Sequence, residues 1–376
     1  MKFTVNSKDM KAAVATASKA IQGKSTLPIL SCVKIDKTGD DHLLITGGDA
    51  EVMLTLRCPL IESHDFHPIC LEAAQLNQIL GSVGSQPVTF EVSGNSVTFI
   101  YKNGHLTFAS QNVEDFPIVE DNIEAVDSVE IPTDKMLNGM SICRPFINHD
   151  ELRPITNGVY LDMTGEYLTM AATDIHKMVR LEMPEIKTKG KVGCVISEKT
   201  ASLLTLLPKG ETLAIRANGR QALFASETFF MMSTGIEGRF PNYNSVIPRD
   251  YTCKATINRA ELISIIKRVS LMGNAATNLI ELRFGSYMGG DGQITVRTRC
   301  LDFATSGEEV MSAEHDLPDN FTIGFKSTCL LDLLNTHTTK EVTFELKDAS
   351  RAGVMHDTEG GNENLLTLLM PMMLDY

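Results

Sequence analysis

The sequence contains no apolar run that approaches the roughly 20 uninterrupted residues of a bilayer-spanning helix. It opens with MKFTVNSKDMK, where apolar and polar residues alternate, so it also lacks the continuous apolar core of a secretory signal peptide. These two absences argue against a membrane protein or a secreted one. We therefore expect a cytoplasmic protein with no membrane partner.

The short motifs of several enzyme classes are absent as well. There is no P-loop, no dinucleotide-binding Gly-x-Gly-x-x-Gly and no nucleophile elbow. Asp174 and His176 occupy alternating positions of a strand-like segment, but no cysteine, glutamate or serine lies at a sequence spacing that would indicate a catalytic or metal-binding partner. We interpret this pair as structural or as part of a binding pocket, and predict a non-catalytic protein without a cofactor.

The cysteines do not form any metal-binding pattern. No C-x-x-C pair occurs, no cluster of ligands forms, and most of the cysteines lie inside apolar runs. The sequence thus predicts buried, reduced thiols and no metal site. The eight cysteines stand at positions 32, 58, 70, 143, 194, 253, 300 and 329.

The sequence has fewer positively charged residues than negatively charged ones. It contains 34 Lys and Arg against 47 Asp and Glu, which gives a net charge of −13. Nucleic-acid binding normally leaves a basic footprint. A DNA-binding role would therefore require the basic residues to be gathered on one surface of an acidic body.

The chain carries an internal repeat with a period of about 126 residues. A strand running into a helix occurs three times, as FTVNSKDMKAAV, VEIPTDKMLNGM and ATINRAELISII, and the strand-end residues are Val5, Ile131 and Ile257. A residue of capping type stands at each turn and is expected to satisfy free N–H groups of the helix. These residues are Ser7, Thr133 and Asn258.

A second helix recurs in the middle of each repeat, with apolar residues at the i, i+3, i+4 spacing of one buried face. The strand that follows reads VTFE at Val88–Glu91 and again at Val342–Glu345, two periods apart. The apolar helix positions are Leu76, Ile79 and Leu80, then Leu203, Leu206 and Leu207, then Leu330, Leu333 and Leu334. Such agreement at a single period indicates triplication.

Segments of alternating apolar and polar residues, separated by turn pairs such as Asn103-Gly104, fill the rest of each repeat. We therefore predict an α+β fold of three repeated domains, each with about eight strands and two helices. Phe-Pro connectors precede boundaries near residues 122–128 and 247–252. The predicted domains are residues 1–124, 125–249 and 250–376.

The charge is distributed as DNA binding would require. The six predicted helices (7–20, 71–81, 133–144, 197–209, 258–271 and 326–339) carry a net charge of +5, and the remainder carries −18. A row of helices could hold DNA through its phosphates without reading bases. Ordinary solvated helix faces are the alternative interpretation of the same lysines.

Over essentially its full length, the chain resembles the β subunit of bacterial DNA polymerase III, the sliding clamp. The resemblance implies a head-to-tail homodimer whose six domains form a ring, with twelve helices lining a central hole for duplex DNA. Three domains per chain fit a dimeric ring rather than a trimeric ring of two-domain chains. The matching segments are MKFTV at residue 1, Thr26-Leu27-Pro28-Ile29-Leu30, Arg153-Pro154-Ile155 before Asn157-Gly158, Ala172-Thr173-Asp174 with His176, Gly238-Arg239-Phe240-Pro241, Ile323-Gly324-Phe325 and Met370-Pro371-Met372.

The resemblance also implies a pocket that binds short peptides of the polymerase catalytic subunit, the clamp loader and other clamp-binding proteins. Aliphatic and methionine side chains suit such an adaptable groove. Ile175 replaces a usual glycine, Lys177 and Ser245 replace usual arginines, and Met373 stands where arginine is common, so this pocket is expected to be more apolar. Its lining would be Thr156, Thr173, Ile175, His176, Lys177, Met178, Pro241, Ser245, Val246, Leu368, Met370, Pro371 and Met372.

Two further surfaces follow from the resemblance. Leu106 and Phe108, on an edge strand of the first domain, would meet Leu271 and Met272 of the other subunit and close the ring. The DNA-facing residues would be Lys8, Lys11, Lys19, Lys24, Lys199, Lys267 and Arg268. Contact with DNA is expected to be weak, sliding and salt-sensitive.

Two rival interpretations remain at this stage. One is a repeat-built scaffold that binds peptides but not DNA, and it differs from a clamp only in the charges of the helices. The other is an enzyme of unknown class with a site at a domain junction.

Overall fold

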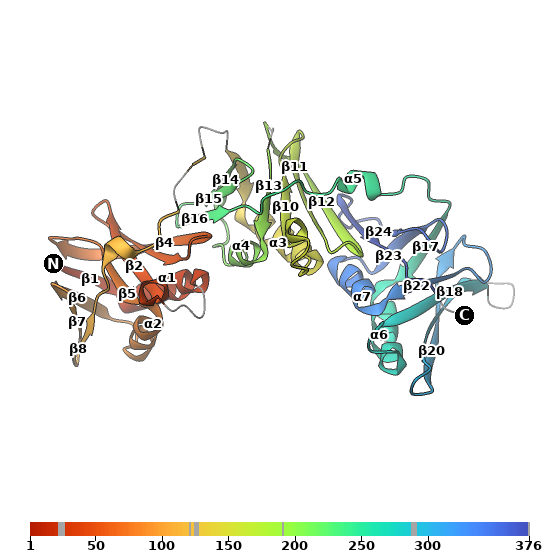
Figure 1. Ribbon diagram of the computed structural model, residues 1–376, viewed down its shortest axis with the longest axis horizontal. Coiled ribbons are helices and arrows are strands. Elements are labelled where there is room, and N and C mark those ends of the chain that lie inside the picture. Colours follow the sequence, from red (N-terminus) through yellow and green to blue (C-terminus); the bar gives the residue numbers. More distant parts are fainter. Residues whose placement is uncertain (22–26, 120–121, 124–127, 190–191, 287–291, 375–376) are drawn as a thin grey trace. The chain divides into compact units, whose positions relative to one another are not determined.

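The computed structural model describes residues 1–21, 27–119, 122–123, 128–189, 192–286 and 292–374 (Figure 1). The chain divides into two compact units, residues 1–140 with 186–237, and residues 141–185 with 238–376. We refer to them as unit 1 and unit 2. No helix in the described ranges is long and apolar enough to cross a membrane.

Unit 1 is built on one sheet that runs from the first predicted domain into the second. Its path is β8-β7-β6-β1-β4-β16-β15-β14-β9, and β2, β3 and β5 join beside it. The strands of this sheet are β1 (Lys2–Asn6), β2 (Cys32–Thr38), β3 (His42–Gly48), β4 (Val52–His64), β5 (Ile69–Glu72), β6 (Pro87–Ser93), β7 (Ser96–Tyr101), β8 (Gly104–Ala109), β9 (Val129–Pro132), β14 (Thr212–Ala217), β15 (Gln221–Ala225) and β16 (Phe229–Thr234). Unit 1 also contains β13 (Gly193–Ser197), which is not part of this sheet. The helices are α1 (Ser7–Ala17), α2 (Ala73–Ser82), α3 (Thr133–Cys143) and α4 (Glu198–Leu204).

Unit 2 contains a sheet of order β10-β11-β12-β25-β24-β23-β17-β21 and a second sheet of order β20-β19-β18-β22. Its strands are β10 (Gly158–Asp162), β11 (Tyr167–Thr173), β12 (Lys177–Lys187), β17 (Cys253–Asn258), β18 (Leu279–Ser286), β19 (Gly292–Cys300), β20 (Thr305–Ser312), β21 (Glu314–His315), β22 (Thr322–Lys326), β23 (Glu341–Leu346), β24 (Gly353–Asp357) and β25 (Leu365–Leu369). Its helices are α5 (Tyr243–Val246), α6 (Arg259–Val269) and α7 (Ser327–Thr336).

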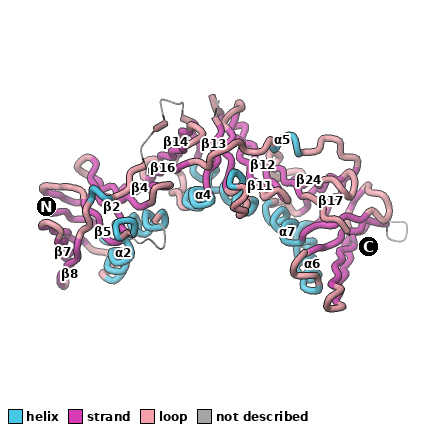
Figure 2. Tube along the Cα trace, viewed as in Figure 1, coloured by secondary structure: helices cyan, strands magenta, loops and turns pink. Residues whose placement is uncertain are grey.

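Within each unit a pair of amphipathic helices packs against strands. Helices α1 and α2 pack on each other in unit 1, and α6 and α7 do so in unit 2 (Figure 2). Their inward positions follow the helical period, as Leu262, Ile265 and Ile266 of α6 are all buried. The buried stack of Phe3 on Phe90, with ring centroids 4.7 Å apart, marks the core of unit 1.

The three repeats form the same strand pairing, which confirms the predicted repetition. Val5 pairs with Val88, Ile131 with Leu213 and Ile257 with Val342. The residue two positions on donates its backbone N–H in each case, Ser7 to the carbonyl of Gln86, Thr133 to Glu211 and Arg259 to Lys340, at 2.9–3.0 Å. Each helix therefore starts at one fixed place relative to its sheet, and the α+β class holds.

One of the three predicted caps is wrong. Asn6 caps α1 by accepting from the N–H of Lys8 at 2.9 Å, whereas the hydroxyl of Ser7 is buried and binds the backbone of Gly84 and Gln86. The hydroxyl of Thr133 accepts from the N–H of Glu211 at 3.2 Å, and whether it also caps α3 stays a prediction. These two hydroxyls join the start of a helix to the loop that directly precedes β6 or β14. Asn258 caps α6 as predicted.

The helix predicted over residues 197–209 is shorter than expected. α4 ends at Leu204, and the next amides bond three residues back, Leu206 to Leu203 and Leu207 to Leu204. Pro208 disfavours helical backbone at the residue before it. The hydrogen bonds therefore change from the α-helical to the tighter 3₁₀ pattern, and the helix ends. Leu206 and Leu207 therefore lie beyond the helix on which we predicted them.

The cysteines are free thiols, as predicted, and all but the half-buried Cys253 are buried. Burial raises the pKa of Cys143 to about 12, because the thiolate would lose its hydration. Within the described ranges, no group of three potential ligands could hold a metal ion.

Candidate functional site

The turn between β11 and β12 in unit 2 holds several predicted pocket residues in a fixed geometry. The hydroxyl of Thr173 donates to the carbonyl of Lys177 at 2.8 Å and accepts from the N–H of Ile175 at 3.0 Å. The carboxylate of Asp174 accepts from the N–H groups of His176 and Lys177, at 3.0 and 2.8 Å. This arrangement leaves the side chains of Ile175 and His176 exposed.

The side chain of Lys177 is buried rather than displayed to a ligand. Lys177 is 6% exposed, and its ammonium bonds to the carboxylate of Asp332 on α7. A carboxylate oxygen of Asp174 lies 3.9 Å from the same nitrogen, and the ring of Phe146 lies 5.4 Å from it. Lys177 therefore acts on the candidate pocket by fixing the turn, and its charge is compensated internally.

The C-terminal tail joins this turn through the backbone. β12 pairs with β25, so that Lys177 stands opposite Leu369 and Met178 opposite Leu368. Beyond the strand, the N–H of Met370 donates to the carbonyl of His176 at 2.7 Å. Met370 is 42% exposed, whereas Met178 and Leu368 are buried, and Pro371 and Met372 are half-buried. The tail adds exposed methionine surface beside the turn.

A buried histidine supports the strand that leads into this tail. His337 lies 3.1 Å from the carboxylate of Asp357 and 2.9 Å from the hydroxyl of Thr367 on β25. Burial lowers the pKa of His337 to about 4, although Asp357 partly opposes the effect. The imidazole is therefore neutral at physiological pH.

The connector around α5 supplies the remaining predicted pocket residues. The hydroxyl of Tyr243 donates to Asp162 on β10 at 2.7 Å, and burial together with this bond raises the pKa of Tyr243. Arg180 of β12 donates to Asn244 at 3.3 Å. With α5 held in this way, Pro241, Ser245 and Val246 are exposed. Thr156, by contrast, is 3% exposed and donates to the carbonyl of Arg153, so its role is to shape the backbone.

The residues predicted to close a ring lie at sheet edges. Among the residues that the structure describes, β8 pairs only with β7 and ends the sheet of unit 1, with Leu106 39% exposed and Phe108 partly packed against the core. In unit 2, Leu271 and Met272 are 77% and 42% exposed in the turn after α6. That turn is bonded to β20, the end of its own sheet, by Thr305. Within the described ranges, each unit thus has an unpaired strand edge with apolar side chains beside it.

The predicted DNA-facing residues differ in their surroundings. Lys8, Lys11, Lys19 and Lys267 are exposed, and Lys24 lies outside the described residues. Lys199, however, pairs with Asp49 at 2.6 Å. Arg268 donates two hydrogen bonds to Glu309, at 2.8 and 2.6 Å, which holds the pKa of Glu309 below its usual range. Lys199 and Arg268 are therefore each engaged in an ion pair with a carboxylate of the same chain.

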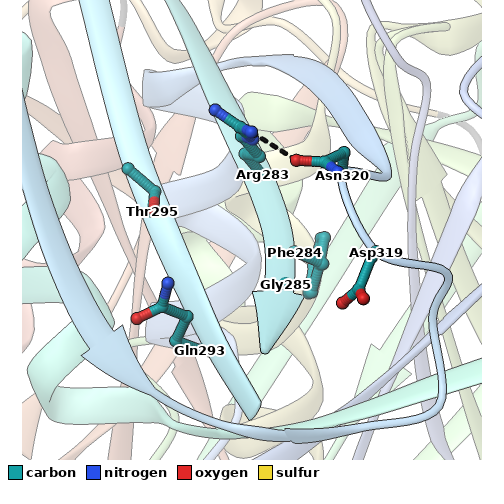
Figure 3. Close-up of a pocket in the computed structure, with 7 residues that line it drawn as sticks. All are labelled: Arg283, Phe284, Gly285, Gln293, Thr295, Asp319 and Asn320. Atoms are coloured by element: carbon teal, nitrogen blue, oxygen red, sulfur yellow. Dashed lines mark hydrogen bonds between the residues drawn. The ribbon is translucent and has the colours of Figure 1, made fainter. Parts of the chain in front are cut away.

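Sequence reasoning missed the residues that organise the turn from a distance. Asp332 is 155 positions from Lys177, and no local pattern marks it or Phe146 as a partner. The sequence also did not predict a polar hollow of about 320 Å³ on β18 and β19 (Figure 3). Arg283 reaches Asn320 across this hollow, and Gln293, Thr295 and Asp319 also line it. None of the predicted site residues lies there.

Comparisons with known proteins agree along the whole chain. Residues 1–120, 130–242 and 244–373 match the N-terminal, central and C-terminal domains of the DNA polymerase III beta subunit. The beta sliding clamps of Synechocystis and Bacillus subtilis are each 23% identical to the chain, with coverage of 100% and 99% of both partners.

Solved structures show the same fold. The DNA polymerase III subunit beta of Pseudomonas aeruginosa has a TM-score of 0.92 at 22% identity, and that of Thermotoga maritima 0.87 at 17%, each with all of both chains covered. Since the three domain models follow one another and leave few residues unmatched, the chain belongs to the DNA polymerase III beta-subunit family.

Proposed function

We propose that this protein is a beta sliding clamp, a non-catalytic processivity factor of DNA replication. Two copies form a head-to-tail ring around duplex DNA and tether DNA polymerase III and other replication and repair proteins to it. The observation that carries this proposal is the unbroken order of three domain matches, with full-length relatives named beta sliding clamps. Its place of action is the cytoplasm, and it requires no cofactor.

The two strand edges support closure of the ring. An unpaired edge with apolar neighbours invites association, and a head-to-tail dimer consumes both kinds of edge at each junction. β8 with Leu106 and Phe108 supplies one side, and β20 with the turn of Leu271 and Met272 supplies the other. We propose that each chain contributes three domains, with boundaries near residues 124 and 249.

Contact with DNA is assigned to exposed lysines of the helices. Lys8 and Lys11 on α1, Lys19 just after it, and Lys267 on α6 are exposed, and a compact ammonium binds phosphate without reading a base. Lys199 and Arg268 would reach phosphate only by exchanging their carboxylate partners. The protein is therefore expected to slide on DNA.

Partner proteins are assigned to the exposed part of the pocket in unit 2. Ile175, Val246 and Met370 are between 42% and 54% exposed, which is high for large apolar side chains that serve only the core. A related clamp from Pseudomonas aeruginosa has been solved bound to griselimycin, so clamps of this fold take up ligands. Short peptides of partner proteins are the proposed ligands here.

Retention on circular DNA tests the proposal. The protein is loaded by the host's clamp loader onto a nicked plasmid, and half of the sample is then linearised. A ring should stay on the circle and slide off the linear ends, whereas a peptide-binding scaffold would remain on neither. Equal retention on both forms would overturn encirclement, and intrinsic turnover of nucleotide or DNA would support an enzyme.

A charge variant tests the DNA surface separately. Lys267→Glu should shorten retention on the circle, and it should reduce the slope of affinity against salt by about 1 to 2. The matched control is Lys340→Glu, which changes an exposed lysine of unit 2 outside the predicted helices. Equal effects of the two variants would remove α6 from the DNA-facing surface.

A further inference from the structure

The turn between β3 and β4 in unit 1 is built like the turn between β11 and β12 in unit 2. The carboxylate of Asp49 accepts from the N–H groups of Glu51 and Val52, both at 2.9 Å, and the N–H of Asp49 donates to the carbonyl of Val52 at 3.0 Å. Asp174 makes the corresponding three bonds in its own turn. A carboxylate that accepts from nearby backbone amides fixes the local chain. The two turns are therefore structural equivalents in successive repeats.

Each of these turns joins its repeat to the next one along the chain. The N–H of Thr234, at the end of β16, donates to the carbonyl of Glu51 at 2.8 Å, and β4 pairs with β16. The same contacts recur in unit 2, where Met370 donates to His176 and β12 pairs with β25. We call the contact of the β3–β4 turn with β16 and α4 the first junction, because it links the first predicted domain to the second.

An ion pair holds each turn to a helix of the next repeat, but the charges are reversed. At the first junction, the carboxylate of Asp49 accepts from the ammonium of Lys199 on α4 at 2.6 Å. In unit 2 the ammonium belongs to the turn, as Lys177, and the carboxylate belongs to the helix α7, as Asp332. A phosphate could use a cation on the helix but not an anion there. An attachment that occurs with either polarity therefore indicates a role in joining the repeats.

The surroundings of Asp49 make Lys199 costly to remove. The side chains of Asp49 and Lys199 are 14% and 29% exposed. Burial alone would raise the pKa of Asp49, but the hydrogen bonds from Lys199 and from the amides of Val52 and Glu51 hold it below its usual range. A phosphate that drew Lys199 away would leave this carboxylate without its cation at a site with little access to water. Lys199 is therefore better suited to the junction than to DNA.

We propose that Lys199 is a positioning residue of the clamp, which locks the first junction through Asp49 and makes no phosphate contact of its own. The lock fixes the angle between the first and second predicted domains, and with it the placement of the exposed lysines of α1. This inference rests on the clamp function proposed above. It removes Lys199 from the DNA-facing residues that the family resemblance implied.

Hydrogen exchange tests the lock in the full-length protein without DNA. The variants are Asp49→Asn, which keeps an oxygen for the two turn amides, and Lys199→Met, which keeps the apolar stem of lysine. The control is Lys11→Met, which removes an exposed lysine of α1. Peptides that contain Thr234 should exchange about tenfold faster in both junction variants and at the wild-type rate in the control. Unchanged exchange in either junction variant would overturn the lock.

DNA binding distinguishes a lock from a phosphate contact. Lys199→Met should leave the slope of affinity against salt unchanged, whereas Lys11→Met should reduce it by about 1. Retention on circular DNA should be shorter in both junction variants than in wild type, because a loosened junction misplaces the lysines of α1. If Lys199 bound phosphate, Asp49→Asn would free its cation and lengthen retention. A reduced slope in Lys199→Met, or retention in Asp49→Asn that equals or exceeds that of wild type, would overturn the inference.

The two experiments also separate this inference from the proposed function. Exchange is measured without DNA, so it reports on the junction whether or not the protein encircles DNA. If the wild type is not retained on circular DNA, the clamp function fails, whereas the exchange rates still decide whether Asp49 and Lys199 lock the first junction.

Discussion

Replacement of Asp332 by Asn should cost more stability than replacement of its partner Lys177 by Met. The side chain of Lys177 is 7% exposed, so its ammonium cannot recover hydration once Asp332 is neutral. The carboxylate of Asp332 is 38% exposed, so it can be hydrated when Lys177 is replaced. Methionine also keeps the apolar stem of lysine in place.

The magnitudes follow from these exposures. Loss of one partner of a buried pair costs about 3 to 5 kcal/mol, and Asp174, 3.9 Å from the ammonium, limits the cost of Asp332→Asn to about 3 kcal/mol. Lys177→Met should cost about 1 kcal/mol, because the remaining carboxylates reach water. The double variant removes both charges and should cost about 2 kcal/mol, which gives a coupling energy of about 2 kcal/mol.

Hydrogen exchange followed by mass spectrometry is the suitable assay, because it reports the opening of the β11–β12 hairpin alone. Global unfolding of a chain with several domains is not a two-state process. Equal costs for the two single variants, or additive costs in the double variant, would refute the account of Lys177 as a buried and compensated cation.

Two further predictions concern buried groups. Burial lowers the pKa of His337 to about 4 from 6.5, so the unfolded chain binds more protons between these values, and stability present above pH 6.5 is lost as pH falls towards 4. Exchange of β25 amides, corrected for intrinsic rates, should reveal a loss of about 2 kcal/mol between pH 7 and pH 5 that His337→Gln abolishes; a flat wild-type profile would contradict this. Cys253, half-buried where the other thiols are buried, should react first with a disulfide reagent, and Cys253→Ser should remove that phase. A second thiol reacting at the same rate would count against the packing described.

The repeat could be predicted from the sequence because each copy must bury a helix face on a strand at a fixed spacing. Val5, Ile131 and Ile257 identify equivalent strand positions, and the structure pairs all three alike. The caps were harder to predict, since a hydroxyl such as that of Ser7 can satisfy either a helix end or a distant backbone. The choice depends on burial, which the local sequence does not reveal.

The site was only partly predictable for the same reason. Pocket positions near Ile175 and Met370 came from resemblance to a family, and the structure brings these segments together by the pairing of β12 with β25 and the backbone bond from Met370 to His176. The partner of Lys177, by contrast, is set by the packing of α7 on the sheet, and a separation of 155 residues leaves no periodic signal for it. Pairing of Lys199 with Asp49 was hidden in the same way.

The oligomeric mass in solution tests the central claim of a two-chain ring most directly. Sedimentation of the wild type should give twice the mass of one chain, and Phe108→Asp should give a single chain because it places a charge at the β8 edge. Leu106→Asp should also give a single chain. This second variant is needed because Phe108 also packs against the core of its own unit, so that Phe108→Asp alone could act by misfolding. A wild-type monomer, or folded variants at both positions that remain dimers, would contradict the ring.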